Sequence, residues 1–436
     1  MIPPTNESSR SARIRQFLPA LVLFAFGFTQ SSLRAENWPQ FRGPDGAGVS
    51  SATNLPTTWS ATENIAWKVE LPGYGASSPV VFNDRVYVTS YSGYGLDQKK
   101  PGDPAELRRH LDCYKLDSGE LEWTKTMEPK SPQKPYRQFV ALHGYASSTP
   151  AVDDSGIYVF YGASGAAAYS HSGELLWEAD CGQGTHDFGT ANSPVIFEDV
   201  VIINASVESG NLIGLDKKSG KEIWRQSDIR SSWNTPALVK AANGETEVAV
   251  NTKGKILAFD PRTGEKLWFC TAMDDYICPS LLAHDDVVYA IGSRKNSAIA
   301  VRAGGRGDVT ETHKLWQLGK GSNVTSPVYY EGHLYWSSEG RGVVYCVDAS
   351  NGEVVYEERL DPSPDRIYAS PVVADGKIYY VSRNKGTYVV AAKPEFELLA
   401  HNTMEGDDSV FNGSPAIVGN RIILRSDRFL YCISKE

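Results

Sequence analysis

Residues 215–224, LDKKSGKEIW, contain the pattern from which the fold class can be predicted. Asp216 can bond the backbone of its own turn and Gly220 can adopt a positive φ, so the segment predicts a hairpin between two strands, the second of which begins near Trp224. Related segments occur along the chain: LDSGELEW (116–123), SHSGELLW (170–177), FDPRTGEKLW (259–268) and VDASNGEVVY (347–356). The recurrence indicates a repeat architecture.

Each copy of the repeat opens with a small or polar residue followed by proline, at a spacing of ~44 residues in most copies. The eight prolines are Pro79, Pro150, Pro194, Pro236, Pro279, Pro327, Pro371 and Pro415. An apolar run, a tight turn, an alternating strand and a third strand then precede the shared hairpin. Four short strands per copy predict an all-β fold, an eight-bladed β-propeller of four-stranded antiparallel blades.

The two ends of the repeat region predict how the ring closes. The eighth copy stops after its third strand, in LYCIS (430–434), whereas ENIAWKVEL (63–71) is an isolated fourth strand around Trp67. We therefore expect this N-terminal strand to complete the last blade, which would cover two exposed sheet edges. The large rings at the start of the fourth strands are expected to dock neighbouring blades, a reading that we favour over a cofactor stack. They are Trp67, Trp123, Trp177, Trp224, Trp268 and Trp316.

The N-terminus has the pattern of a secretory signal peptide. Arg10, Arg13 and Arg15 precede an apolar run at 17–28, and a polar stretch ends in Ala35. The run is shorter than the ~20 residues that a membrane-spanning helix needs, and no Cys follows it to accept a lipid. We expect a signal peptide at 1–35, an extended segment at 36–58 and a propeller at 59–436. The protein would be exported, periplasmic or extracellular, and not a lipoprotein.

Charge and cysteine content limit the possible partners. The chain has 436 residues and a net charge of -9, which argues against nucleic acid and anionic membranes as partners. The six cysteines include no CxxC pair and no zinc-ligand spacing, and we do not expect a disulfide between Cys270 and Cys278. A monomer is expected.

The repeat resembles that of the pyrroloquinoline-quinone (PQQ) dehydrogenases and, equally, that of the BamB-like outer-membrane assembly propellers. The resemblance covers residues 59–434, and WPQFRGPDGAGVS (38–50) also resembles a stretch of bacterial quinoprotein-like propellers. The first likeness implies PQQ and Ca²⁺ in the channel, and the second implies an envelope scaffold without cofactor. The dehydrogenases carry vicinal cysteines and large insertions in their blades, whereas this sequence has no adjacent cysteines and most of its blades are minimal. It also lacks the lipid-acceptor Cys of BamB.

Two insertions lengthen the interval between Pro79 and Pro150. They span residues 91–110 and 127–143, on the face that carries the connections between blades. Asp103 as N-cap and Pro104 at the first helical position predict a short helix over 105–111. We expect the first insertion to form a rim or lid at the channel mouth, or else to be a tolerated surface loop.

A series of cations occupies equivalent turns between strands two and three. Lys253, Lys295, Arg341 and Lys385 follow one another in blades 4 to 7. The further cations Arg366, Arg425 and Arg428 are predicted to extend the series. On an acidic protein this arc would attract anions, although solvated hairpin tips are the commoner explanation.

The residues before each opening proline should begin the strands that line the channel. Most are small, and the exceptions are Asn192, Trp233, Asn234, Asp275, Tyr276, Asn323, Arg366, Tyr368 and Asn412. Oxygens among them could hold Ca²⁺, Asp275 could act as a general base, and the aromatic rings could stack on a sugar. A wet channel without such chemistry is the alternative. His143 and His186 could pair at the mouth with Asp187, but loop histidines are usually solvated, so no metal is expected.

The sequence favours an exported, non-catalytic β-propeller that binds an envelope protein or an anionic small ligand on the insertion-bearing face. Lys253, Lys295, Arg341, Lys385 and Arg366 would contribute to binding, with the channel-mouth residues named above. No cofactor is expected. The alternative is a quinoprotein dehydrogenase that oxidises alcohols or sugars with PQQ and Ca²⁺, in which Asp275 would be the catalytic residue.

Overall fold

The computed structural model describes residues 1–4, 37–130 and 132–435. The chain divides into two compact units, Met1–Arg34 and Ala35–Glu436. The predicted signal peptide lies outside the described residues, except for its first four. Among the residues that are described, no helix is both long and apolar enough to cross a bilayer.

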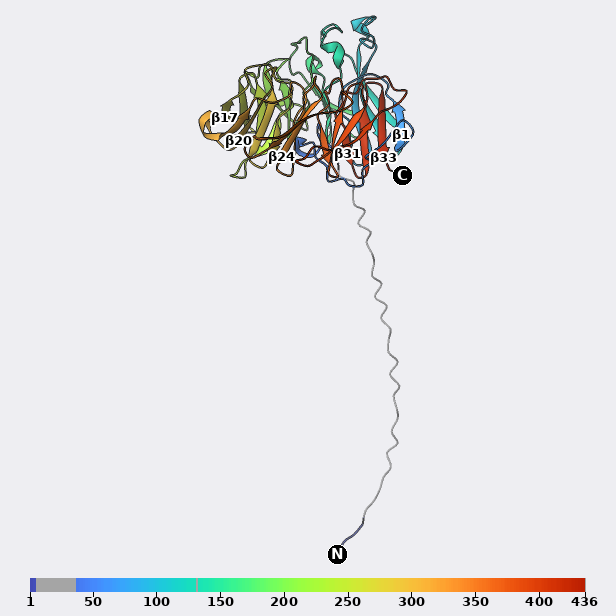
Figure 1. Cartoon of the computed structure of the whole chain (residues 1–436), viewed down its shortest axis with the longest axis vertical. Helices are drawn as coiled ribbons and strands as arrows, with labels where there is room; N and C mark the ends of the chain where they lie inside the picture. The colour runs from blue at the N-terminus through green and yellow to red at the C-terminus, as the bar shows by residue number, and fades with distance from the viewer. Residues whose placement is uncertain (5–36, 131, 436) are drawn as a thin grey trace. The chain divides into compact units, whose positions relative to one another are not determined.

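The described part of the second unit forms eight antiparallel sheets of four strands, and one sheet gains a short fifth strand (Figure 1). Blade 1 consists of β2 (Val80–Phe82), β3 (Arg85–Ser92), β4 (Arg108–Lys115) and β5 (Leu121–Met127), and blade 2 of β6 (Ala151–Asp153), β7 (Gly156–Phe160), β8 (Ala166–Tyr169) and β9 (Leu175–Ala179). Blade 3 consists of β10 (Val195–Phe197), β11 (Val200–Ala205), β12 (Asn211–Asp216) and β13 (Glu222–Gln226). Blade 4 consists of β14 (Ala237–Lys240), β15 (Thr246–Thr252), β16 (Lys255–Phe259) and β17 (Lys266–Thr271), with β21 (Gly307–Asp308) as its short fifth strand. The eight-bladed propeller is confirmed.

The second half of the ring repeats the same order of strands. Blade 5 consists of β18 (Leu282–His284), β19 (Val287–Gly292), β20 (Ser297–Arg302) and β22 (Lys314–Leu318), and blade 6 of β23 (Val328–Tyr330), β24 (His333–Ser337), β25 (Val343–Asp348) and β26 (Val354–Arg359). Blade 7 consists of β27 (Val372–Ala374), β28 (Lys377–Val381), β29 (Thr387–Ala391) and β30 (Leu398–Asn402). Blade 8 consists of β31 (Ala416–Val418), β32 (Arg421–Arg425) and β33 (Phe429–Ser434), with β1 (Ile65–Glu70) as its fourth strand. The second and third strands of each blade are buried on both faces, for example throughout β7, β11 and β29, so the core lies between adjacent blades.

The ring closes through β1, as the sequence predicts. β1 pairs antiparallel with β33, with Trp67 opposite Cys432 and Lys68 opposite Tyr431. Arg425 seals the same joint from inside, because its buried guanidinium donates to the carbonyl oxygens of Ser77 and Thr89 in blade 1. The prediction that Arg425 belongs to an exposed cationic arc is therefore wrong.

The aromatic residues of the fourth strands lie against the next blade. Trp177 Nε1 donates to the Lys217 carbonyl of blade 3 at 2.9 Å, and its ring packs on Gly220, where an added Cβ would lie 2.6 Å from the ring. The close approach explains the glycine of the shared hairpin. Equivalent bonds to backbone carbonyls are made by Trp67, Trp224 and Trp316, whereas Trp123 Nε1 has no hydrogen-bond partner among the described residues.

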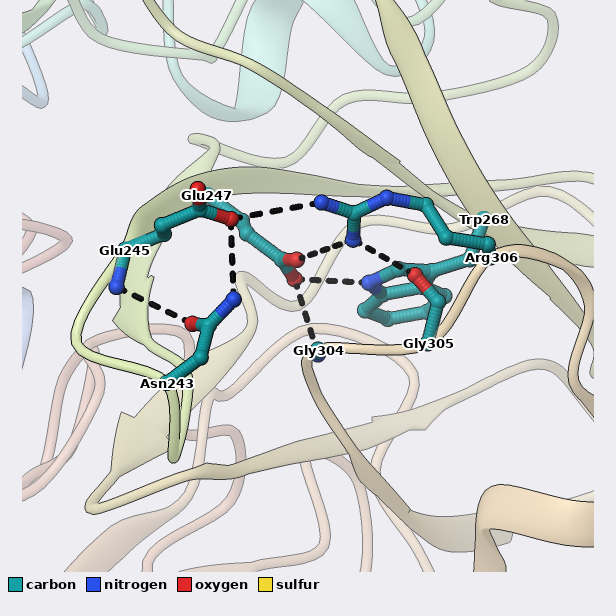
Figure 2. A network of polar contacts seen from close by, with 7 residues as sticks. All are labelled: Asn243, Glu245, Glu247, Trp268, Gly304, Gly305 and Arg306. Carbon is teal, nitrogen blue, oxygen red and sulfur yellow. Dashed lines mark hydrogen bonds and ion pairs between the residues drawn. The ribbon is translucent and has the colours of Figure 1, made fainter.

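The joint between blades 4 and 5 departs from this scheme (Figure 2). Blade 5 has no D-x-x-x-G hairpin between its last two strands, and Trp268 donates to the carboxylate of buried Glu247 at 2.6 Å. The same carboxylate accepts the Gly304 N–H at 3.2 Å and faces Arg306 at 3.4 Å. A charged network thus replaces a backbone carbonyl where the repeat lacks its turn.

Helical structure is confined to single turns among the described residues. These are η1 (Pro44–Gly46), η2 (Pro104–Glu106), η3 (Val140–Leu142), η4 (Gly162–Ser164) and α1 (Thr310–His313). The helix predicted over 105–111 is wrong: Asp103 does cap the turn by accepting the Ala105 N–H, but β4 begins at Arg108. Pairing with β3 captures those residues, since ladder hydrogen bonds outweigh the local helix signal.

Residues 37–59, which we call the strap, run across the ring on the side of the hairpins between strands one and two. Trp38 pairs with Val81 of blade 1, and the Val152 N–H of blade 2 donates to Pro39. Farther along, Val49 pairs with Val373 of blade 7. Trp38 is fully buried. The WPQFRGPDGAGVS segment is therefore a structural cross-brace of the propeller.

Candidate functional site

A closed ring of hydroxyl groups surrounds the channel axis. In every blade, a Ser or Thr at the start of the inner strand accepts the backbone N–H of its counterpart in the preceding blade, at 2.9 or 3.0 Å. The eight are Ser78, Thr149, Ser193, Thr235, Ser280, Ser326, Ser370 and Ser414. Each oxygen is an acceptor in these bonds, so each hydroxyl keeps its own hydrogen to donate.

The hydroxyl ring was missed at the sequence level, although a Ser or Thr precedes the opening proline in seven copies. In blade 5 the order is reversed: Pro279 comes before Ser280, and Leu281 occupies the place that proline has elsewhere. The prediction that Pro279 opens its strand at the equivalent position is therefore wrong by two residues. Spacing alone did not reveal the shift, because one proline at the expected interval satisfied the pattern.

The hydroxyl ring lines a central cavity of about 230 Å³. Above the hydroxyls, the wall is formed by Phe188, Trp233, Tyr276 and Tyr368. Phe188 is central to this aromatic cluster, with ring centroids 5.1 Å from Trp233 and 5.0 Å from Tyr276. Phe41 of the strap lines the cavity as well. The site is therefore a mainly neutral chamber, polar at its waist and aromatic towards one end.

The second insertion covers that aromatic end. Phe139 packs edge-on against Phe188, with centroids 4.6 Å apart, and the carbonyl of Leu142 accepts hydrogen bonds from Arg383 (3.0 Å) and Asn412 (2.9 Å). We call residues 139–143 the lid. It leaves the chain between blades 1 and 2 and contacts blades 3, 7 and 8, so it spans the channel mouth.

The first insertion supports the lid's base and does not reach the channel cavity. Tyr91 and Tyr94 pack with Tyr145, and the Tyr91 and Tyr145 rings meet edge-on at 5.4 Å. Buried Arg109 binds the Tyr145 carbonyl at 3.0 Å and Gln133 at 2.7 Å. Both insertions rise from the same side of the ring in Figure 1. The lid is therefore part of the second insertion, residues 127–143, and the first insertion, residues 91–110, packs against the residues that follow the lid.

The two candidate histidines bind the backbone of one residue and do not converge on a metal position. His143 Nε2 lies 2.7 Å from the Phe188 carbonyl, while the Phe188 N–H donates to His186 Nδ1 at 3.1 Å. Burial lowers the pKa of His143, which keeps the ring neutral with Nε2 as the donor. Among the described residues, no cluster of three metal-ligating side chains is present.

The other predicted channel residues differ in what they reach. Trp233, Tyr276, Tyr368, Asn323 and Asn412 line the cavity. Asn234 is fully buried and bonds Ser232 and the Asn251 backbone, and Asn192 is buried outside the lining. Arg366 is exposed and lies 3.2 Å from the Tyr368 hydroxyl. The structure brings the aromatic residues together around the cavity, whereas the Asn234 side chain only makes hydrogen bonds inside the protein, to Ser232 and Asn251.

Asp275 is held by a cation and does not line the cavity. Arg294 contacts both of its carboxylate oxygens, at 3.0 and 3.1 Å, and this pairing holds the pKa of Asp275 below its usual value. PQQ with Ca²⁺ would need several oxygen ligands around the ion, usually including carboxylates. Among the described lining residues none is acidic, and the unpartnered amide oxygens are those of Asn323 and Asn412. This donor set does not fit a Ca²⁺–quinone site.

Glu208 is a buried carboxylate in the turn between β11 and β12. Its Oε1 accepts the Thr190 hydroxyl at 2.5 Å, and its Oε2 is buried without a hydrogen-bond partner among the described residues. Burial raises the pKa of Glu208 to about 7, opposed by the Thr190 bond and by the charge of Arg109. Sequence reasoning missed this carboxylate, because nothing in VESGN (207–211) signals that a hairpin tip will be covered.

The four hairpin cations occupy the turns predicted for them, all exposed. Lys253 lies 3.9 Å from Asp274, while Lys295, Arg341 and Lys385 form no ion pair with any described residue. Arg428, by contrast, pairs with Asp408 at 3.1 Å. The cations line the same face as the lid, because strand-two to strand-three turns and inter-blade connections share one side of a propeller.

Comparisons with known proteins match most of this chain to one family. Residues 108–311 and 306–428 match the family described as outer membrane protein assembly factor BamB. A Yersinia pestis protein of that name is 25% identical over 332 residues, 74% of this chain and 63% of the relative. Its Salmonella typhimurium counterpart is 23% identical over 192 residues, 42% of this chain. The chain spans about half the length of these curated relatives, 46% and 63%.

Solved structures share the fold at low identity. BamB from Moraxella catarrhalis superposes with a TM-score of 0.59 at 16% identity, over 84% of this chain and 96% of that one. The quinohemoprotein alcohol dehydrogenase from Comamonas testosteroni gives 0.63 at 11% identity, over 92% and 81%. These likenesses concern architecture alone. The family match, which extends over most of the repeat region, carries the assignment: this chain belongs to the family of outer membrane protein assembly factor BamB.

Proposed function

We propose that the protein is an exported, non-catalytic propeller that binds another envelope protein on the lid face. The observation that carries this proposal is the lid itself. A chain segment anchored to blades 3, 7 and 8 presents Phe139, a residue that is 51% exposed. Exposed aromatic residues on a rigid support are typical anchors of protein interfaces.

The charge distribution favours an acidic partner surface. Lys253, Lys295, Arg341 and Lys385 are exposed around the same face, and three of them lack an ion-pair partner among the described residues. Such cations contribute mainly to the association rate and to salt dependence. A partner with an acidic rim and an apolar recess for Phe139 fits both features. The names of the curated relatives, as outer membrane protein assembly factors, support an envelope protein as partner.

Site-specific photocrosslinking tests the proposal in cells. A photoreactive amino acid at Phe139 should give one discrete crosslinked product, while the same amino acid at Leu175 should not. Leu175 is a matched control, because it is 52% exposed but lies on β9 at the circumference of the ring. Equal crosslinking at both positions, or none at Phe139, would contradict the proposal.

Charge reversal tests the role of the cations in the same assay. Lys253→Glu with Lys295→Glu should weaken the Phe139 crosslink and remove its salt dependence. Lys218→Glu with Lys221→Glu is the matched control, because both are exposed but lie in the opposite set of turns. If the two double variants weaken the crosslink equally, the proposal that the partner surface is acidic is wrong.

The dehydrogenase alternative receives no support from the channel's donor set, and we propose that the protein works without PQQ. Titration of the purified protein with PQQ and Ca²⁺ tests this directly. We expect no saturable change in the quinone absorption and no dye reduction with alcohols or sugars. Either signal would overturn the cofactor-free proposal while leaving the crosslinking result to be judged separately.

A further inference from the structure

The wall of the central cavity carries no charge. Its described lining residues include no Asp, Glu, Lys or Arg, and burial lowers the pKa of His143, so that this ring is uncharged at neutral pH. An ion that entered the cavity would lose hydration without gaining a counter-charge, which is costly. The lining therefore favours an uncharged ligand, in contrast to the cationic turns of the lid face.

The waist of the cavity offers hydrogen-bond donors. All eight residues of the hydroxyl ring line the cavity. Each of their oxygens accepts one backbone N–H, and none of the eight hydroxyl groups donates its hydrogen to a described residue. Buried polar groups normally find a partner, so these hydrogens are available to water or to the oxygens of a ligand.

The aromatic end of the cavity is held in place by hydrogen bonds. Trp233 Nε1 donates to the Gly189 carbonyl at 2.9 Å, and the Asn323 side chain donates to the Tyr276 hydroxyl at 2.8 Å. Phe188 packs against both rings, and Phe188 and Tyr276 remain partly exposed. Rings that are fixed before binding lose little conformational entropy when a ligand stacks on them. The cavity therefore presents a rigid apolar platform above a polar waist.

The volume of the cavity matches a ligand with a single ring. The cavity measures about 230 Å³. It is larger than the ~150 Å³ of an apolar cavity that holds benzene, and smaller than the ~300 Å³ at which pockets for drug-sized molecules begin. A six-membered ring with several small substituents therefore has room in the channel.

An apolar ring satisfies only part of this cavity. It fills the aromatic end but leaves hydroxyl hydrogens of the waist without an acceptor, which has a cost for each buried group. Water satisfies the hydroxyls but gains little against the aromatic wall, and a ligand that displaces weakly held water with an apolar surface gains affinity. A sugar has C–H groups on one face of its ring and oxygens around its edge, so it satisfies both parts.

We propose that the central channel binds a neutral sugar ring. The C–H face of the sugar packs on Phe188 and Tyr276, and its oxygens accept hydrogen bonds from the hydroxyl ring. This ligand class follows from three observations on one cavity: the uncharged lining, the available hydroxyl hydrogens and the fixed aromatic wall. The sugar site goes beyond the proposed partner surface, from which it is separate except for Phe139, a residue of the lid that also lines the cavity.

Ligand-observed saturation-transfer NMR on the purified exported protein tests the proposal. D-glucose and D-galactose are titrated separately, and each is compared with its open-chain alditol and with its uronic acid. At least one hexose should give a saturable signal, strongest at its ring C–H protons. The alditol should bind roughly two- to tenfold more weakly, because it lacks the ring face. If neither hexose gives a saturable signal, or if the alditol binds as well as the hexose, the proposal is wrong.

The uronic acid tests the uncharged character of the site. It has the same ring as the hexose and one negative charge, and it should bind roughly tenfold more weakly or worse, because the lining offers no counter-charge. Arg383 lies 4.6 Å from the centroid of the Tyr368 ring without lining the cavity, and its charge would favour the acid. Weaker binding of the acid is therefore a stringent result, and equal or tighter binding would contradict a neutral-sugar site.

Two pairs of substitutions locate the ligand. Ala191 lines the cavity and is exposed, so Ala191→Trp takes up ligand space without removing a buried side chain and should abolish the signal. Ala242→Trp is its matched control, because Ala242 is exposed but does not line the cavity. Tyr276→Ala should weaken binding roughly two- to tenfold, whereas Tyr330→Ala, at a partly exposed tyrosine outside the cavity, should not. Binding that survives Ala191→Trp, or that responds equally within either pair, would overturn the assignment.

The sugar site and the partner surface are tested separately. Lys253→Glu with Lys295→Glu changes the lid face but not the cavity lining, so this double variant should bind the hexose as the parent does. Loss of the hexose signal in this variant would place the sugar on the lid face and overturn the channel site. The Phe139 crosslink does not enter this measurement, so either proposal can fail while the other stands.

Discussion

The two ends of the central channel are closed by segments of opposite character. The strap closes one end as part of the hydrophobic core: Trp38 is fully buried and pairs with Val81, and Leu55 and Trp59 pack into the same cluster. The lid closes the other end through hydrogen bonds to the Leu142 carbonyl and one half-exposed ring, Phe139. The strap is therefore a component of the fold, whereas the lid is an addition supported by it.

The largest expected difference between the two ends is in global stability. Trp38→Ala removes a fully buried ring and should lower the free energy of unfolding by about 3–5 kcal/mol. Phe139→Ala removes a half-exposed ring that packs on Phe188 and should lower it by only about 1 kcal/mol. Urea unfolding of both variants measures the contrast. Similar losses would mean that the lid is as much a part of the core as the strap.

Glu208 should make the lid face sensitive to pH. Burial raises the pKa of Glu208 to about 7 in the folded protein, above the ordinary glutamate value of 4.5, so the folded state holds the proton more tightly than the unfolded state. Stability is therefore lost as pH rises from 4.5 to 7, by about 3 kcal/mol in total. Glu208→Gln should recover this loss at pH 8 and have little effect at pH 4.5. The free energy of unfolding at both pH values checks it. If Glu208→Gln is less stable than the parent at pH 8, the ionised Glu208 carboxylate does not destabilise the folded protein and the prediction is wrong.

The anchors of the lid should control local opening more than global stability. Asn412→Ala removes one of the two hydrogen bonds to the Leu142 carbonyl, a change of about 1 kcal/mol. Hydrogen exchange should become faster in residues 139–143 and stay unchanged in the strap. Exchange that accelerates equally in both segments would show that the two ends are coupled through the ring.

Acidification should weaken the lid through His143. Burial lowers the folded pKa of His143 below the ordinary value of 6.5, so the open state takes up a proton before the closed state does. The closed lid loses stability as pH falls below about 6.5, the usual range of histidine. Limited proteolysis should cut near residues 139–143 more readily at pH 5.5 than at pH 7.5, and His143→Gln should remove the difference. An unchanged pH dependence in that variant would exclude His143 as its source.

Much of the fold is readable because it repeats. A hairpin with Asp and Gly followed by Trp occurs at regular spacing, and each copy forms the same four strands. An assignment of strands made for one copy therefore applies to the whole ring. The same regularity predicted the closure by Trp67, since β33 would otherwise have an open edge. Where a copy departs from the pattern, sequence reasoning fails: Pro279 misplaced the start of blade 5, and residues 105–111 were predicted as helix although β3 captures most of them as strand.

The candidate site is less predictable than the fold. The channel aromatic residues Trp233, Tyr276 and Tyr368 could be found because large residues stand out among small ones at the start of the inner strands. Arg425 and Arg428 looked alike in sequence, yet one is buried in the closing joint and the other pairs with Asp408 at the surface. Glu208 gave no signal, because its burial depends on the connection between blades 2 and 3, from which Gly184 and Thr190 contact it.

The blade number, the order of strands and the closure of the ring could all be predicted from the chain, because they follow from local periodicity and from the need to pair every strand edge. Which segment covers which end of the channel, and which charged groups are left without partners, became visible in the folded molecule. Those outcomes depend on contacts between residues far apart in the chain, such as Leu142 with Asn412 and Val49 with Val373. No local pattern encodes them, since the desolvation of a charge is set by everything that packs around it.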